Sequence, residues 1–185
     1  MLVREGLDGF SMQRLARAAG VSPATLYIYF KDRDDLLFQL YKVEMEKMAE
    51  VTLKAFDPEL PFADGLRVQW RNRAQYCLAH PLEAEFLEHV RHSPYHQRFL
   101  PRLDPEFIEK MGLFVKNAIR RKEMLPVPKE VFWALAYAPL YQLLKFKLSG
   151  RSLGGQPYAS GETKFALDDG TMELALTLVI KALTP

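Results

Sequence analysis

The sequence predicts an all-α protein, with an N-terminal helix-turn-helix domain over residues 1–45 joined to a larger helical domain over residues 46–185. Two observations predict this class. Apolar residues recur at steps of three and four through most of the chain, and runs of alternating β-branched residues are almost absent. Prolines and glycines mark the breaks between these periodic segments. The expected helices cover residues 1–5, 12–19, 23–29, 33–55, 62–79, 82–92, 105–122, 129–148 and 169–183.

The composition is that of an ordinary globular protein. Of the 185 residues 49% are hydrophobic, and 25 basic residues nearly balance 23 acidic ones. A chain of this length buries roughly 70% of the surface of its unfolded form, so its core needs neither disulfides nor a structural metal. The single cysteine, Cys77, cannot form an internal disulfide, which favours a reducing, cytoplasmic location. No run of 18 apolar residues occurs, so we expect no membrane span.

The segment over residues 11–30 meets the requirements of two short crossing helices. Ser11 and Ser22 are N-cap residues, and Pro23 follows at the first helical position. Gly20 suits the positive φ that ends a helix. The apolar seam between the two helices is expected to consist of Leu15, Ala16, Ala19, Val21 and Leu26. This is the pattern of a helix-turn-helix, whose second helix enters the major groove of DNA.

The form of this motif is specific. Residues 25–31 (Thr-Leu-Tyr-Ile-Tyr-Phe-Lys) and 34–37 (Asp-Asp-Leu-Leu) closely resemble the tetracycline-repressor (TetR) family of bacterial transcription regulators, strongly over residues 1–45 and beyond them only as a succession of helices. The resemblance implies a DNA-binding domain followed by a ligand-binding and dimerisation domain. It assigns to the groove and its edges Gln13, Pro23, Ala24, Thr25 and Tyr27, and to phosphates Ser11, Tyr29 and Lys31. The N-cap Ser22 completes the candidate DNA site.

Charge near the motif is a matter of local arrangement, because the net charge of the chain is only +2. The cations that flank the recognition segment are Arg14, Arg17, Lys31 and Arg33.

The resembled family has a full helix before the position of Gly6, whereas only residues 1–5 precede it here. We therefore expect an N-terminally short sequence: a misassigned start, first residues absent from the sequence, or a DNA-binding core that lacks a part.

Aromatic residues at helical spacing in residues 46–185 are typical of a core, but a small-molecule site has the same lining with a few polar anchors. The TetR resemblance implies a pocket without identifying its walls. The candidate ligand residues are Trp70, Tyr76, Phe86, His89, Phe107, Met111, Phe114, Trp133, Tyr137 and Tyr141. Arg67, Arg71 and Arg73 would favour an acidic ligand, although three arginines on one helix are more often a solvated face.

One group of residues has metal-ligand character: Glu85, Glu88, His89, His92 and His96. The spacing of the histidines matches no established zinc signature and Arg91 lies among them, so an exposed polar helix face is the preferred interpretation. We therefore expect no metal and no cofactor. No GxSxG, HExxH, P-loop or GxGxxG motif is present, which predicts no catalytic residues and a protein that is not an enzyme.

The last two predicted helices, residues 129–148 and 169–183, are apolar on more than one face, and Pro139 predicts a kink in the first of them. One face is expected to pack inward and another to form a homodimer through a four-helix interface, as in the resembled family. Leu176 and Val179 are candidate outward positions. The sequence thus predicts a dimeric repressor that binds a double-stranded DNA operator and is released by a small-molecule effector. The alternative is a helical metal- or ligand-binding protein whose helix-turn-helix does not bind DNA.

Overall fold

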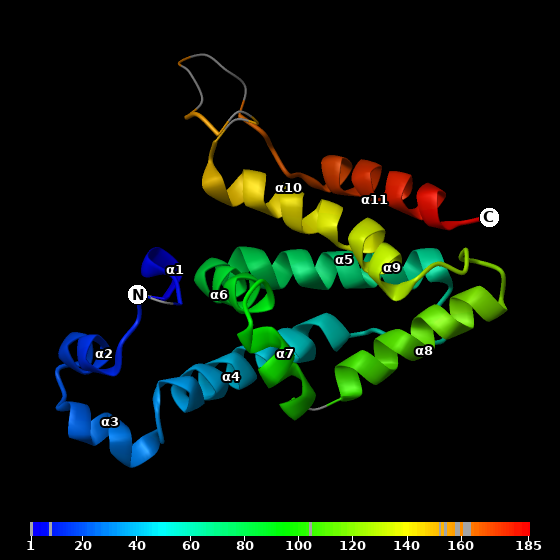
Figure 1. Cartoon of the computed structure of the whole chain (residues 1–185). Coiled ribbons are helices and arrows are strands. Elements are labelled where there is room, and N and C mark those ends of the chain that lie inside the picture. Colours follow the sequence, from blue (N-terminus) through cyan, green and yellow to red (C-terminus); the bar gives the residue numbers. More distant parts are fainter. Residues whose placement is uncertain are drawn as a thin grey trace. The chain divides into compact units, whose positions relative to one another are not determined.

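The computed structural model describes residues 2–7, 9–103, 105–151, 153, 155–157, 160 and 164–185. The described residues are helical without any strand, as predicted, and none of their helices is both long and apolar enough to cross a lipid bilayer. The elements, shown in Figure 1, are α1 (Leu2–Glu5), α2 (Met12–Ala19), α3 (Pro23–Tyr29), α4 (Arg33–Leu53), α5 (Phe62–Ala79), α6 (Pro81–Arg91), α7 (Tyr95–Phe99), the 3-10 helix η1 (Leu100–Arg102), α8 (Glu106–Arg120), α9 (Lys129–Ala136), α10 (Ala138–Ser149) and α11 (Asp169–Leu183).

The chain divides into two compact units that interleave in sequence. Unit 1 comprises Met1–Glu50 and His80–Pro105, and unit 2 comprises Val51–Ala79 and Glu106–Pro185. The sequence predicts a boundary between residues 45 and 46 that separates two domains of different function. The two units are defined by packing and do not test that boundary, which stays a prediction. Packing, in contrast, groups residues 80–105 with the N-terminal helices, although they lie well beyond that boundary in the sequence.

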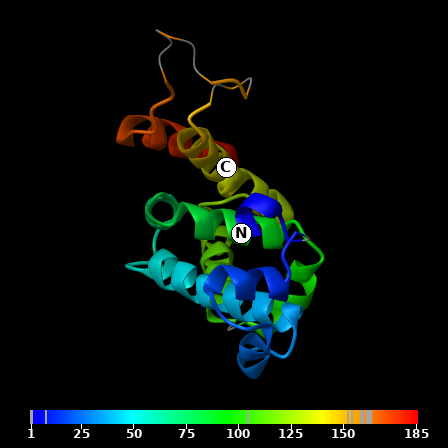
Figure 2. The same ribbon diagram turned by 90° about the vertical axis from the view of Figure 1, so that its left-hand side faces the viewer.

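Unit 1 has an aromatic core between α4 and α7. The ring of Phe99 lies 5.3 Å from that of Phe38 and 5.8 Å from that of Tyr41, centroid to centroid, and Tyr95 lies 5.2 Å from Phe99. Within the same unit α1 lies against α6, and α2 lies beside α3 (Figures 1 and 2). The N-terminal helices therefore share one unit with helices from the middle of the chain.

Helix α5 is central to unit 2, because α8, α10 and α11 all pack against it (Figure 1). Its residues Phe62 and Trp70 are buried. Trp70 donates its Nε1–H to the carbonyl oxygen of Ala136 over 2.7 Å, which ties α5 to the end of α9. Phe114 of α8 stacks on Phe62 with ring centroids 5.9 Å apart. Aromatic side chains thus join α5 to α8 and α9 in the core of unit 2.

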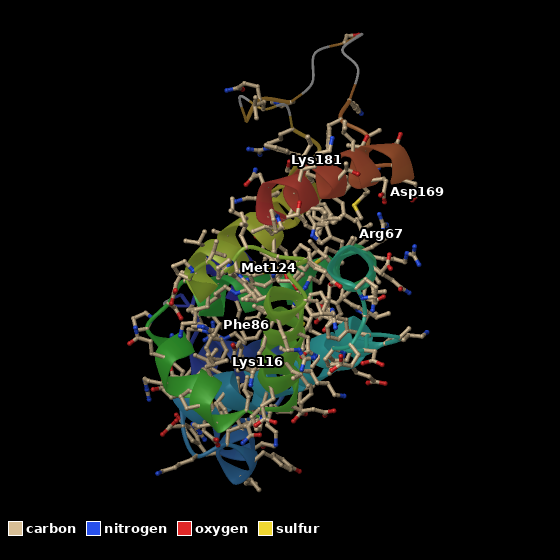
Figure 3. The ribbon with its side chains drawn as sticks, turned by 90° about the vertical axis from the view of Figure 1, so that its right-hand side faces the viewer. Arg67, Phe86, Lys116, Met124, Asp169 and Lys181 are labelled. Carbon is tan, nitrogen blue, oxygen red and sulfur yellow. The ribbon has the colours of Figure 1, made fainter. Side chains whose placement is uncertain are left out.

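The last helix, α11, is attached to unit 2 at both ends. In Figure 3, Arg67 lies on the side of α5 that is near Asp169, the first residue of α11. The Arg67 guanidinium pairs with Glu173 of α11 at 2.7 Å. At the other end, the backbone N–H of Leu125 donates to the carbonyl oxygen of Leu183 over 2.8 Å. These contacts hold α11 along α5 and the segment after α8.

The helices differ from the sequence prediction in two parts of the chain. Residues 129–148 form two helices instead of one, since α9 ends at Ala136 and α10 starts at Ala138. Pro139 explains this break, because proline has no N–H to donate to the carbonyl one helical turn earlier and its ring clashes with that carbonyl. Helix α7 and the 3-10 helix η1 after it were not predicted at all. The five residues of α7 lie between Pro94 and Pro101, and a segment that short shows no apolar periodicity.

The expected apolar seam between α2 and α3 is only partly buried. Ala16 is fully buried, and Leu15 and Leu26 are half-buried, whereas Ala19 and Val21 are exposed. The prediction was therefore wrong for Ala19 and Val21. Helices of eight and seven residues contact each other along one short line, so positions beside that line stay in solvent.

Gly65 of α5 provides a test of the packing in unit 2. A Cβ atom at this position would overlap the ring of Phe114, which is fully buried and cannot move aside easily. We expect Gly65→Ala to lower the free energy of unfolding by about 1–3 kcal/mol through overpacking, measured by urea denaturation.

The matched control is Gly112→Ala on α8, where nothing lies within 4 Å of the added Cβ. Alanine should there stabilise the helix by up to about 1 kcal/mol. Equal effects of both substitutions would contradict the close contact between α5 and Phe114.

Candidate nucleic-acid interface

Capping interactions set both ends of α2. Its N-cap is Ser11, whose hydroxyl oxygen accepts the backbone N–H of Arg14 at 3.3 Å. The helix ends at Gly20, which takes φ 68° and ψ 26°. Glycine adopts this left-handed conformation at little cost, and any residue with a Cβ does so less readily. The chain therefore turns sharply into α3 where the sequence predicts it.

The start of α3 is held by its own N-cap. The hydroxyl oxygen of Ser22 accepts the backbone N–H of Thr25 at 3.2 Å and shares a second hydrogen bond with the Thr25 hydroxyl at 2.9 Å. Pro23 occupies the first helical position, where its missing N–H costs nothing. Because the Thr25 hydroxyl is engaged by Ser22, the orientation of this side chain is set within the helix itself.

The outer surface of α3 is open to solvent. None of its seven residues, all of which the structure describes, is buried. The candidate DNA residues lie in one continuous segment of unit 1, from the start of α2 to the residue before the α4 cap. Two of them, Ser11 and Thr25, are half-buried. The exposed ones are Gln13, Ser22, Pro23, Ala24, Tyr27, Tyr29 and Lys31.

The backbone at Lys31 belongs to the cap of α4. Asp32 Oδ1 accepts the N–H of Asp35 at 2.8 Å, and Asp35 Oδ2 accepts the N–H of Lys31 at 3.0 Å. Such a reciprocal arrangement satisfies donors that have no partner within the helix, and carboxylates also favour the positive end of the helix dipole. The Lys31 side chain remains exposed. Its ammonium group is thus available on a backbone that the cap holds in place.

Arg33 differs from the other cations that the sequence places beside the motif. It is half-buried, and its Nε donates to the carbonyl oxygen of Phe10 over 3.1 Å. Its Nη1 donates to the hydroxyl of Tyr95 over 2.7 Å and its Nη2 to the carbonyl oxygen of Leu7. Arg33 is therefore not a free surface cation, because its donors join the segment before α2 to α7.

Asp34 connects the start of α4 to α7 in the same network. It accepts a hydrogen bond from the Tyr95 hydroxyl at 3.0 Å and pairs with Arg98 at 2.9 Å. Burial raises the pKa of Asp34, but the hydrogen bonds from Arg98 and Tyr95 outweigh burial and leave the pKa below its ordinary value. Asp34 is therefore ionised throughout the neutral range.

Sequence reasoning missed two cations near Lys31. Arg98 of α7 and Arg102 of η1 are exposed, and Arg102 lies 3.5 Å from the ring centroid of Phe38. A cleft of about 350 Å³ in unit 1 is lined by Lys31, Asp32, Asp34, Asp35, Arg98, Phe99 and Arg102. No sequence signal points to these arginines, because they are distant from the motif in the chain and lie in helices too short to predict.

The candidate ligand residues fall in both units. Phe86 and His89 lie on α6 in unit 1, so the structure does not place them in one unit with the others. The buried members in unit 2 are Trp70, Tyr76, Met111, Phe114 and Tyr137. The half-buried members are Phe107, Trp133 and Tyr141. Arg73 is 0% exposed, and four of these residues gather around it: Phe107, Trp133, Tyr137 and Tyr141. The interpretation as a solvated face is therefore wrong for Arg73.

The histidine group of α6 and α7 forms pairs rather than a cluster. Glu88 pairs with Arg91 at 3.0 Å and with His92 at 3.5 Å, and His96 Nδ1 lies 3.4 Å from the hydroxyl of Tyr41. Burial lowers the pKa of His96, and the charges of Arg91 and His92 lower it further. Among the described residues, no three His, Cys, Asp or Glu side chains are placed to hold a metal ion.

The geometry of α2 and α3 defines the class of protein. Two short capped helices joined at a left-handed glycine, with no residue of the second helix buried, form a helix-turn-helix. Residues 1–40 match the family described as bacterial regulatory proteins, tetR family. The match covers the N-terminal part of the chain that contains the helix-turn-helix, and over these residues the resemblance drawn from residues 25–37 is confirmed.

Two sequence relatives match the N-terminal part of the chain. An uncharacterised helix-turn-helix-type transcriptional regulator of Haemophilus influenzae is 38% identical over 72 residues, which are 39% of this chain and 38% of that protein. The fatty acid metabolism regulator protein of Bacillus subtilis is 32% identical over 50 residues, 27% of this chain and 26% of that protein. The matches thus span well under half the length of these relatives.

Solved structures extend the similarity of fold to the whole chain. A TetR-family transcriptional regulator of Haemophilus influenzae superposes with a TM-score of 0.75 at 22% identity, covering 100% of this chain and 90% of that one. A putative TetR-family regulator of Vibrio parahaemolyticus gives a TM-score of 0.76 at 21% identity, covering 100% and 92%. The fold class predicted from the sequence is confirmed.

The contacts of Asp34 predict a pH-dependent contribution to stability. Its pKa is lower in the folded protein than its ordinary value of 3.8, so its ionised form stabilises the fold above that pH. This contribution should be complete at pH 7 and be lost as the pH falls below about 3.8 through the folded pKa. We expect Asp34→Asn to cost about 0.5–1 kcal/mol at pH 7, as for a part-exposed ion pair.

Urea denaturation of wild type and variant between pH 3 and 7 measures the difference, which should shrink at the acid end. Glu50→Gln, at an exposed carboxylate of the same helix, serves as the control and should show little effect. A difference that stays constant over this pH range would contradict the role of the charge on Asp34.

Proposed function

We propose that this protein is a DNA-binding transcriptional regulator in which α3 enters the major groove of an operator. The observation that carries the proposal is the outer surface of α3, where five of the seven residues are exposed and none is buried, while capping bonds hold both the helix start and the turn before it. A helix that only packed in a core would bury one face. An exposed, firmly held helix with small residues at its start is suited to approach base edges.

The chemistry of the candidate residues supports a division of roles. Gln13 is exposed at the start of α2, and an amide of this kind can bind adenine with two hydrogen bonds. Ala24 and the methyl group of Thr25 offer apolar contact to thymine. Lys31 and Tyr29, exposed at the other end of α3, have the chemistry of phosphate partners. Base contacts then determine sequence preference, and phosphate contacts determine position and salt dependence.

We further propose that the protein acts as a homodimeric repressor released from its operator by a small-molecule effector. Two recognition helices about 34–36 Å apart enter successive major grooves on one face of DNA. A ligand that binds better to a conformation with another separation would shift the population away from the DNA-bound form. The effector site is proposed in unit 2, where the aromatic candidate residues gather around Arg73.

The surface of unit 2 supports a dimer but changes the residues expected in it. Leu176 and Val179 are only 3% and 8% exposed within the subunit, so they are wrong as outward positions. On the same helix, Leu174 and Leu178 are 63% and 58% exposed. They lie four residues apart and thus on one face of α11. An exposed apolar strip of this kind is typical of an interaction surface.

DNA binding provides the first functional test. We expect Lys31→Ala to weaken binding to all duplexes alike, because one phosphate contact is lost. The slope of the logarithm of the binding constant against the logarithm of the salt concentration should become shallower by about one. Gln13→Ala should instead relax preference at one base pair, by about 1–3 kcal/mol. Fluorescence anisotropy at several salt concentrations, on duplexes selected from a random pool, measures both effects.

Lys42→Ala is the control for the loss of a surface charge, since Lys42 is exposed on α4 and pairs with Glu46 at 3.7 Å. It should leave binding unchanged. The proposed roles fail if Lys31→Ala and Gln13→Ala reduce binding equally on every sequence.

The dimer is tested at α11. The double substitution Leu174→Glu and Leu178→Glu would bury two carboxylates in the proposed interface, so we expect a folded monomer in sedimentation velocity runs at micromolar concentration. Leu82→Glu is the control, because Leu82 is a similarly exposed leucine on α6 of unit 1 and lies outside the proposed interface. A double variant that stays dimeric would show that the interface lies elsewhere.

A further inference from the structure

Arg73 is a fully buried cation in the core of unit 2. Its side chain is 0% exposed although it lies on α5 between the exposed residues Arg71 and Gln75. Aromatic rings surround its guanidinium group. The central carbon lies 4.2 Å from the ring centroid of Tyr137, 5.3 Å from that of Trp133 and 5.5 Å from that of Phe107.

The hydrogen bonding of this guanidinium is incomplete on one edge. Nη1 donates to the hydroxyl of Tyr141 over 2.8 Å, whereas Nε and Nη2 have no hydrogen-bond partner in the described part of the chain. No described carboxylate pairs with Arg73. The Nε–H and Nη2–H groups point from the same edge of the planar group, and that edge can bind a carboxylate through two parallel hydrogen bonds.

The groups next to Arg73 do not neutralise its charge. The buried hydroxyl of Tyr137 interacts with the Arg73 guanidinium, but no described residue meets hydrogen-bond geometry with it. Burial raises the pKa of Tyr137 to about 12, so this phenol is neutral at physiological pH. Aromatic faces attract a cation, but they carry no net charge. One helical turn earlier on α5, Gln69 has an unmatched buried Oε1 as well.

An isolated buried charge opposes folding, because an arginine remains protonated and loses its hydration without gaining a counter-ion. Packing alone would favour an apolar side chain at this position. Groups that a fold carries against its own stability occur mainly at functional sites. We propose that Arg73 anchors a small organic carboxylate, which binds the Nε and Nη2 edge of the guanidinium that has no hydrogen-bond partner.

The inference rests on the proposed function, in which unit 2 binds an effector, and it specifies the chemical class of that effector. A single guanidinium compensates one negative charge, which favours a monocarboxylate. The unmatched Tyr137 hydroxyl is a third donor for the same anion. Phe107, Trp133 and Tyr141 are half-buried, so the aromatic wall around Arg73 extends to the surface and suits an apolar body on the ligand.

The first experiment compares charged and neutral forms of the same probes. Benzoate, phenylacetate, octanoate and decanoate are each titrated beside their primary amides, and the Tm of the full chain is followed by scanning fluorimetry. We expect at least one carboxylate to raise the Tm in a concentration-dependent manner, with its amide at least tenfold weaker. The proposal is overturned if no carboxylate raises the Tm, or if the amides act as strongly as the acids.

The second experiment removes the cation. Arg73→Met keeps much of the side-chain volume, and we expect a higher Tm without ligand together with loss of the carboxylate response. Arg71→Met, two residues earlier and exposed, should change neither. A lower Tm of Arg73→Met, or an unfolded variant, would show that Arg73 stabilises the fold and would overturn the proposal.

Anisotropy of the ligand-free wild type on selected duplexes separates the two proposals. A carboxylate response without DNA binding would support the anchor and contradict the regulatory function. DNA binding without a carboxylate response would contradict the anchor and leave the regulator intact.

Discussion

The hydrogen bonds of Arg33 are the interaction on which the geometry of the helix-turn-helix depends. Its guanidinium binds backbone carbonyls of Leu7 and Phe10, which precede α2, and the hydroxyl of Tyr95 on α7. Short helices such as α2 and α3 bury little apolar surface, so their packing alone holds them weakly. A charged group that joins three segments of unit 1 compensates for this, and Asp34 extends the network to Arg98.

The two units use a partly or fully buried arginine in opposite ways. In unit 1 the donors of Arg33 meet carbonyl and hydroxyl oxygens, and the pair of Arg98 with Asp34 lies nearby. In unit 2 the donors of Arg73 are only partly matched, and no described carboxylate lies within ion-pair distance. A buried cation whose donors all have hydrogen-bond partners holds the surrounding segments in one arrangement. A buried cation with unpaired donors lowers the stability of the fold, and a ligand of opposite charge that pairs with it recovers that free energy. This contrast separates a structural role from a binding role for the same residue type.

Much of the fold could be predicted from the sequence, because its signals are local. The caps at Ser11 and Ser22 and the left-handed Gly20 appear where these residue types predict them. Helices that run for many turns were also predicted closely, since apolar periodicity accumulates with length. The elements that were predicted wrongly lack such a long, regular signal. Helix α7 has only five residues, and the break at Tyr137 depends on how one proline acts within an otherwise continuous apolar pattern.

The sequence by itself determined the helix-turn-helix, the family resemblance and the all-helical class, because each follows from residues close together in the chain. Only the tertiary structure decided that residues 80–105 pack with the N-terminal helices, that Leu174 and not Leu176 is exposed, and that Arg73 is buried while its neighbour Arg71 is not. Burial is a property of contacts between distant segments. Two arginines on one helix look alike in sequence, and they differ only once aromatic rings from α8, α9 and the start of α10 surround one of them.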